Sequence, residues 1–317
     1  MYSTQKKITF RKKKKTRIQK KTKQSFFLPS YVPKTNYFEE IFLMNWSQFS
    51  EDGVMEETGF PEEVLNYLWF KYLSSQNKFT PEDFYNCYVY INLYPRYKSS
   101  QRIFKHGENY ITKLLSFIKF FVPLLHEIVW ERRLCVFNHT PYFSQFVTGI
   151  VDTFPVEILK PEDHSKASAT YNGKYETNVY KFQVVVDFLG RIIYFSGPHL
   201  GSKYDGHIWR DTYEDHPLYK WEWILGDCHY SAEEHIITRY RSPTRNINEQ
   251  YFNEVIEYHR SRVEHTNSLF SRHAMFNSIF RGNTETIFFC AHLIAQTTAV
   301  FTSMYIRYQP FGPWNHY

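Results

Sequence analysis

Cysteine is scarce in this chain of 317 residues, and its four copies lie far apart. No two of them form a CxxC pair, so the sequence predicts neither a zinc ribbon nor a disulfide framework, and we expect reduced, intracellular thiols. A GxxxxGK[ST] loop and a GxGxxG turn are also missing, which disfavours a nucleotide-driven motor and a dinucleotide enzyme. The 14 histidines contain no HExxH pattern, and we expect most of them to be structural or surface residues.

Long uninterrupted apolar runs are lacking as well. The two longest candidates, 114–125 and 287–306, are broken by polar residues or proline and do not supply the ~18–20 apolar residues that a bilayer span needs. Segment 25–29 is too short for a secretory signal and is cut by proline. We therefore expect no membrane association. With 43% hydrophobic residues, the chain is long enough to bury a substantial core.

Acidic residues are missing between Lys6 and Lys23, where eleven Lys and Arg residues gather. The rest of the chain carries 27 basic and 32 acidic residues, so the net charge of +6 comes from this tail. A block of like charge repels itself and cannot pack, so we expect residues 1–33 to be a disordered tail. A nuclear localisation signal and an electrostatic anchor on phosphates are the functional interpretations, beside a solvated tail without a partner.

Residues 34–144 predict a helical domain. Thr80 and Pro81 are typical of a helix start. Further on, a short helix over 101–105, a turn at Gly107 and a helical pattern over 110–130, kinked or broken at Pro123, form a candidate helix-turn-helix. The second of these helices offers few basic side chains for DNA, so a plain helical packing domain stays open as the alternative.

Residues 145–317 predict an α/β domain. Its expected strands are 146–152, 179–187, 191–197 and 221–227, and its expected helices are 203–213, 232–240, 248–272 and 284–308. Three strands, a helix, a further strand and then helices is the order of an RNase H-like core with C-terminal helices.

Three acids stand out in this domain. Asp152 and Asp227 each close an apolar run, and Glu264 lies beside the apolar stripe of the helix over 248–272. Two carboxylates from strand ends and one from a helix are, in outline, a site for a hard divalent cation. Simpler interpretations exist: strand-terminal Asp often caps a turn, and Glu264 can pair with Arg260 one turn earlier.

The sequence around these acids resembles the DDE superfamily endonucleases, specifically the PIF/Harbinger-type transposases. Six elements follow in that family's order over about residues 145–275: Asp152-Thr153, Tyr171 to Lys174, Gln183 to Asp187, Gly201 to Asp205, Gly226 to Tyr230, and Arg262 to Glu264. Any one of them is weak, but six in the correct order are specific.

The resemblance implies a metal-dependent nuclease or transposase that cuts and joins DNA phosphodiester bonds by a two-metal mechanism. Asp152, Asp227 and Glu264 would be its catalytic residues and metal ligands, with Mg²⁺ as the metal and Mn²⁺ able to substitute. Asp205 would be a further ligand or a neighbour that orients the ligands. The resemblance implies that the protein acts on double-stranded DNA together with a Myb-like DNA-binding partner protein. It is also compatible with a homo-oligomer. The basic run adds the expectation of a nuclear location, without excluding the cytoplasm.

The sequence departs from the family pattern beside the second acid, where a GDKGY-like motif is replaced by Gly226 to Tyr230, with Cys228 at the position of its Lys and His229 at that of its second Gly. The lost basic residue would weaken a phosphate contact. This leaves open a domesticated, non-catalytic derivative of a transposase that serves as a nuclear DNA-binding or protein-interaction module.

Overall fold

The computed structural model describes residues 44–50, 53–107, 109–136 and 146–308. The chain divides into one unit over Met1–Leu43 and another over Met44–Tyr317, and all the described residues belong to the second unit. The basic tail predicted for residues 1–33 therefore lies outside the described residues.

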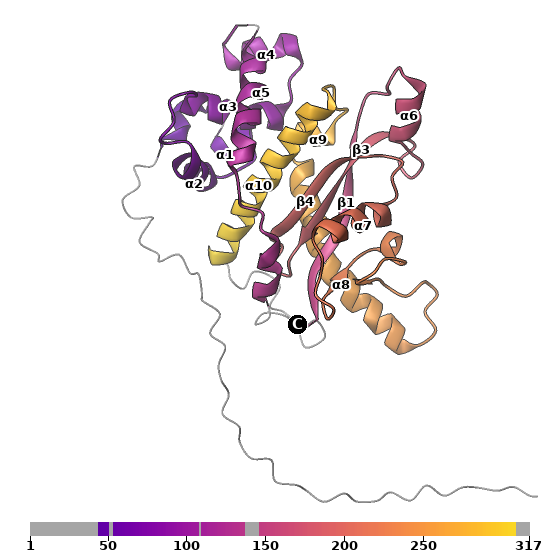
Figure 1. Ribbon diagram of the computed structural model, residues 1–317. Helices are drawn as coiled ribbons and strands as arrows, with labels where there is room; N and C mark the ends of the chain where they lie inside the picture. Colours follow the sequence, from indigo (N-terminus) through magenta and orange to yellow (C-terminus); the bar gives the residue numbers. More distant parts are fainter. Residues whose placement is uncertain (1–43, 51–52, 108, 137–145, 309–317) are drawn as a thin grey trace, which may run out of the picture. The chain divides into compact units, whose positions relative to one another are not determined.

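A mixed sheet of six strands holds this unit together (Figure 1). The strands are β1 (Val147–Glu157), β2 (Tyr171–Asn172), β3 (Thr177–Val186), β4 (Ile192–Leu200), β5 (Trp223–Leu225) and β6 (Ile236–Ile237). Their order is β2-β3-β1-β5-β6, and β4 also pairs with β3. Strand β3 runs antiparallel to β1, β2 and β4, whereas β1, β5 and β6 are parallel. The protein is thus of the mixed α/β class, as expected.

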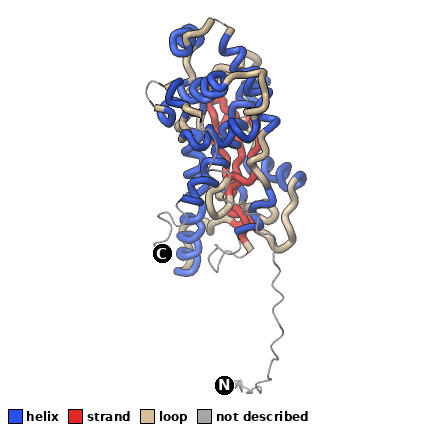
Figure 2. Tube along the Cα trace, turned by 90° about the vertical axis from the view of Figure 1, so that its left-hand side faces the viewer, coloured by secondary structure: helices blue, strands red, loops and turns tan. Residues whose placement is uncertain are grey.

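Both faces of the sheet are buried, because successive side chains of a strand point to opposite faces. Ile150 packs in the larger hydrophobic core and its neighbour Val151 in a smaller one. The same alternation separates Val184 from Val185. The apolar runs of β1 and β3 follow from this burial on two sides, and Figure 2 shows the strands lying among helices.

Ten α-helices lie in the described part of the chain. Five precede the sheet: α1 (Val54–Thr58), α2 (Glu62–Tyr72), α3 (Pro81–Leu93), α4 (Tyr97–Phe104) and α5 (Tyr110–Phe121). The other five are α6 (His164–Thr170), α7 (Asp205–Asp215), α8 (Ile247–Ser271), α9 (Ala274–Asn277) and α10 (Thr284–Tyr308). The larger core is continuous from Trp46 in the first helical region to Val300 in α10, and it includes residues of the sheet.

The helical region before the sheet largely follows the local signals. Helix α3 starts at Pro81 with Thr80 as its N-cap, as the sequence predicts, and the structure adds a capping box between Thr80 and Asp83. Helix α5 ends before Pro123, which lies in a 3-10 turn. Helices α4 and α5 are the segments of the candidate helix-turn-helix. The amine of Lys113 pairs with Asp83 at 2.7 Å, and that of Lys119 pairs with Glu285 at 2.7 Å. These pairs favour a packing role for α5, while DNA reading there stays a prediction.

Two local expectations in the α/β region are wrong. Strand β1 continues to Glu157 because residues from Ile150 onward pair with β3, so Asp152 lies inside a strand and not at its end. The helix expected over 232–240 is absent from the described structure. His235 has a left-handed backbone (φ 58°), and Ile236–Ile237 pair with β5 as an edge strand. Tertiary pairing there overrides the local helical pattern.

Helix α10 includes a stretch, Thr284–Met304, that is long and apolar enough to cross a membrane by length and composition alone. In this structure 56% of its most apolar window is buried. Cys290, Ala291 and Ile294 are fully buried in the larger core, which agrees with the prediction of a core helix.

Candidate active site

Asp152 and Asp227 come together because their strands are neighbours. Strands β1 and β5 are parallel and pair Ile150 with Leu225, and each acid lies two positions beyond that pair. Burial raises the pKa of Asp152 to about 7; the guanidinium of Arg260 opposes this, and the carboxylates of Asp227 and Asp205 add to it. Three acids of the predicted set therefore share one site.

Asp227 follows Gly226 directly after β5 and begins the short 3-10 turn η6 (Cys228–Tyr230). Its Oδ1 accepts a hydrogen bond of 2.8 Å from the backbone N–H of His229. The residue therefore does cap a turn, which is the simpler role that the sequence allowed. Capping occupies one carboxylate oxygen and leaves the other for a ligand.

Helix α8 reaches Asp152 through Asn267. The Asn267 Nδ2 group donates a hydrogen bond of 3.1 Å to Asp152 Oδ2. The buried guanidinium of Arg260 acts on Asp152 electrostatically. Residues 260, 264 and 267 recur at helical spacing, so they share one face of α8.

Glu264 lies between these two residues on that face. Its carboxylate is 3.6 Å from Arg260 Nη2, and its side chain is 50% exposed. This ion pair is the simpler role expected for Glu264, and the described contacts give it no direct bond to Asp152 or Asp227. The structure thus places Glu264 at the edge of the acid site, linked to it through Arg260.

Asp205 is the first residue of α7 and is held by a buried lysine. Lys181 Nζ lies 2.9 Å from Asp205 Oδ1 and also donates to the carbonyl of Lys203 at 2.7 Å. The turn before α7 packs tightly at Gly201, where a Cβ would lie 2.1 Å from the Thr170 carbonyl oxygen. Asp205 is therefore held in a fixed position close to the other acids, and its carboxylate is already paired with the ammonium group of Lys181.

Lys174 brings a second cation to the site from the turn between β2 and β3. Burial disfavours its charged form, but Tyr175, Asp227 and Asp152 together raise its pKa above the ordinary value. Asn172 shapes this turn: its Oδ1 accepts from the Lys174 N–H at 2.9 Å, and its Nδ2 donates to the Gly201 carbonyl at 2.8 Å.

The sequence interpretation assigned no site role to Lys174, Asn267 or Lys181. A signal existed for Asn267, which follows Glu264 by three positions on a helix and so must share its face. No comparable signal marked Lys181, because its partner Asp205 lies on another element.

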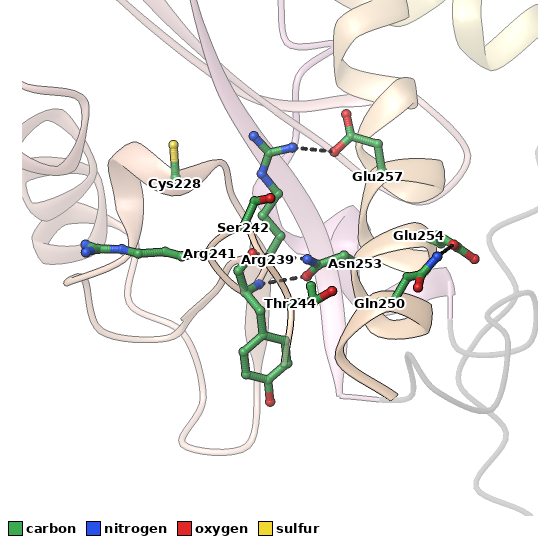
Figure 3. Close-up of a pocket in the computed structure, with 10 residues that line it drawn as sticks. Cys228, Arg239, Arg241, Ser242, Thr244, Gln250, Asn253, Glu254 and Glu257 are labelled. Atoms are coloured by element: carbon green, nitrogen blue, oxygen red, sulfur yellow. Dashed lines mark hydrogen bonds and ion pairs between the residues drawn. The ribbon is translucent and has the colours of Figure 1, made fainter. Parts of the chain in front are cut away.

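A groove opens beside the acid site, between the segment after β6 and the first half of α8 (Figure 3). Cys228 lines it together with Arg239, Arg241 and Glu257. Arg239 pairs with Glu257 at 3.6 Å, and the backbone of Tyr240 exchanges two hydrogen bonds with Asn253. Arg241 extends away from α8 in Figure 3. The walls of the groove are thus tied to each other, while Arg241 faces outward.

The donor set fits a hard divalent cation. Carboxylate oxygens are the ligands that Mg²⁺ and Mn²⁺ prefer. Burial and the neighbouring acids disfavour the ionised form of Asp152, so a cation bound beside it would offset the cost of that charge. Asp152 and Asp227 would hold the ion, with Asp205 beside them.

Comparison with known families points the same way. Residues 151–302 match the family model described as DDE superfamily endonuclease. The match includes Asp152, Asp205, Asp227 and Glu264 and supports assignment to this superfamily, whose members are nucleases that act on DNA and generally use divalent metals. No curated protein and no solved structure matches the chain.

Proposed function

We propose that this protein is a metal-dependent DNA endonuclease or transposase of the PIF/Harbinger type. The observation that carries the proposal is the register of β1 and β5, which brings Asp152 and Asp227 side by side within the residues that match the superfamily model. Asp152 is also buried, and its burial together with the nearby carboxylates of Asp227 and Asp205 raises its pKa to about 7 against the opposing effect of Arg260. Such perturbed groups cluster at functional sites.

Asp152, Asp227 and Glu264 are the proposed metal ligands, and Asp205 is the proposed orienting neighbour. Bound divalent ions would activate the attacking water or 3′-hydroxyl and stabilise the leaving 3′-oxygen. The Asn267 amide fixes the rotamer of Asp152. The side chain of Glu264 is half-exposed and would exchange its ion pair with Arg260 for the metal.

The protein's own cations supply the phosphate contacts in this proposal. Lys174 lies close to both Asp152 and Asp227, so its amine would face the scissile phosphate. Arg241 on the neighbouring groove would contact the DNA backbone further along. These contacts position a duplex without reading its sequence.

An RNase H-like core is part of the proposal. The chain runs through three antiparallel strands, a helix and a strand parallel to the first, and then a long helix carries the last acid. A Myb-like partner protein would supply sequence recognition, since the cations of α5 are engaged within the molecule. A nuclear location and a homo-oligomer complete the proposal.

The test is metal-dependent nicking of supercoiled plasmid. We expect Mg²⁺ and Mn²⁺ to support nicking by the purified chain and EDTA to abolish it. Asp152→Asn, Asp227→Asn and Glu264→Gln should each reduce nicking by at least ~10³-fold while the circular dichroism spectrum is retained, because each removes an anionic ligand at nearly constant shape. The exposed acids Glu214 and Asp215 give matched controls, Glu214→Gln and Asp215→Asn. Undiminished nicking by any of the three site variants would remove that residue from the site.

A non-catalytic, domesticated module is the second candidate. Two observations favour it: the Arg260–Glu264 ion pair, and Cys228 and His229 at the positions of the Lys and second Gly of the family's GDKGY-like motif. On this alternative, the purified chain would bind DNA without nicking it under any divalent metal.

A further inference from the structure

Next to the proposed catalytic acids, three different metal-binding side chains meet on one turn. The ligand atoms of Asp227, Cys228 and His229 all lie within 4.8 Å of one another. Consecutive residues rarely converge in this way, because neighbouring side chains of an extended chain point apart. Here the 3-10 turn η6 curls the backbone, and a carboxylate, a thiol and an imidazole come within reach of one ion.

The chemistry of this set differs from that of the acids around Asp152. A thiol and an imidazole are soft or borderline ligands and favour Zn²⁺ or Co²⁺ over Mg²⁺. Three protein ligands with a fourth position left to water make an open tetrahedral zinc site. We propose that Asp227, Cys228 and His229 form a binding site for a zinc-like ion.

Access to the site agrees with this proposal. Cys228 is exposed and lines the groove beside α8, and Figure 3 draws its sulfur without a partner among the groove residues. Cys87 and Cys290, in contrast, are buried, and burial raises the pKa of both thiols. The thiol of Cys228 is therefore open to an incoming ion, whereas those of Cys87 and Cys290 are not.

The site has a consequence for the reaction because Asp227 belongs to both sets of ligands. An ion held by Cys228 and His229 would draw the Asp227 carboxylate toward η6 and away from the Mg²⁺ ion that it would share with Asp152. Micromolar Zn²⁺ would then inhibit the Mg²⁺-dependent reaction. This consequence rests on the proposed nuclease function, whereas ion binding itself does not.

The direct test uses Co²⁺ as the probe with the full chain in a thiol-free reductant. Bound Co²⁺ should give a near-ultraviolet sulfur-to-cobalt charge-transfer band, at one ion per chain, that stoichiometric Zn²⁺ removes. Cys228→Ser should abolish the band, and His229→Gln should weaken Co²⁺ binding at least ~10-fold. Cys135→Ser is the matched control and should keep the band.

An equally strong band in Cys228→Ser, or the absence of any band in the folded wild-type chain, would overturn the site. The regulatory consequence is measured separately, as the Zn²⁺ concentration that halves Mg²⁺-dependent nicking. That concentration should rise at least ~10-fold in Cys228→Ser. A chain that binds Co²⁺ through sulfur but never nicks DNA would contradict the nuclease function alone, and a nicking chain without the band would contradict the zinc site alone.

Discussion

Asn267 on α8 donates a hydrogen bond to Asp152 on β1 across 3.1 Å, which joins the long helix to the central strand at the proposed metal site. The bond fixes which carboxylate oxygen of Asp152 is left for a metal. A ligand that is oriented in this way loses less conformational freedom when an ion binds.

Replacing Asn267 by alanine should therefore weaken metal binding without removing a ligand. We expect Asn267→Ala to raise the Mn²⁺ concentration needed for half-maximal nicking ~10-fold, with a smaller change in the maximal rate. Asn248→Ala, at an exposed position of the same helix, is the control. A metal requirement that does not change in Asn267→Ala would show that the amide has no part in orienting Asp152.

The pH dependence of stability should carry the signature of Asp152. Its folded pKa of about 7 lies above the unfolded value of ~3.9, so the folded chain binds the proton more tightly. The free energy of unfolding contributed by this group is therefore full below pH ~4 and is lost as pH rises through ~7.

Urea unfolding in EDTA at pH 5 and pH 8 measures this effect. The wild-type chain should lose about 1–2 kcal/mol more than Asp152→Asn between these pH values. Since the proton competes with the ion, Mn²⁺ affinity of the wild type should also fall as pH drops below ~7. Parallel stability curves for wild type and Asp152→Asn would contradict the raised pKa.

Asp205 should matter less for catalysis than the three proposed ligands. Asp205→Asn leaves the buried Lys181 without its carboxylate, so we expect a loss of about 1–3 kcal/mol in stability and a ~10-fold loss of nicking. Adding Lys181→Met should recover stability but not activity. If Asp205→Asn lowers metal affinity as much as Asp227→Asn, then Asp205 is a direct ligand.

The basic tail should dominate non-specific DNA binding. Deleting residues 1–25 removes the eleven Lys and Arg residues between Lys6 and Lys23 and leaves a chain with more acidic than basic residues. We expect weaker DNA binding with a flatter dependence on salt, because fewer counterions are released, while nicking persists at high DNA concentration. Nuclear accumulation of a tagged chain should fall in the same deletion and return with a heterologous signal.

An unchanged salt dependence after this deletion would place the main phosphate contacts on the body of the protein. Lys174 and Arg241 would then be the first residues to test, as Lys174→Met and Arg241→Met.

Much of the fold could be predicted from local patterns. The bounds of α10 agree with the prediction, and those of α8 agree within one residue at each end, because long apolar periodicity defines both helices and Asn246 caps the start of α8. The strands expected over 179–187 and 191–197 are also present as β3 and β4, and the carboxylate of Asp187 accepts hydrogen bonds from the backbone N–H groups of Leu189 and Arg191 in the turn between them. The prediction of a helix over 232–240 is wrong, because the two-residue edge strand β6 forms by pairing with β5 and has no periodicity of its own to read.

The sequence by itself determined which acids to consider and the order of motifs around them, because those are properties of residue type and spacing. Only the tertiary structure decided their arrangement. The register of β1 with β5 brings Asp152 beside Asp227. The packing of α8 lets Asn267 donate a hydrogen bond to Asp152, while Glu264 pairs with Arg260. The turn after β5 brings the ligand atoms of Cys228 and His229 close enough to that of Asp227 for all three to hold one ion. Strand pairing and helix packing join residues far apart in the chain, and no local pattern encodes which side chain meets which.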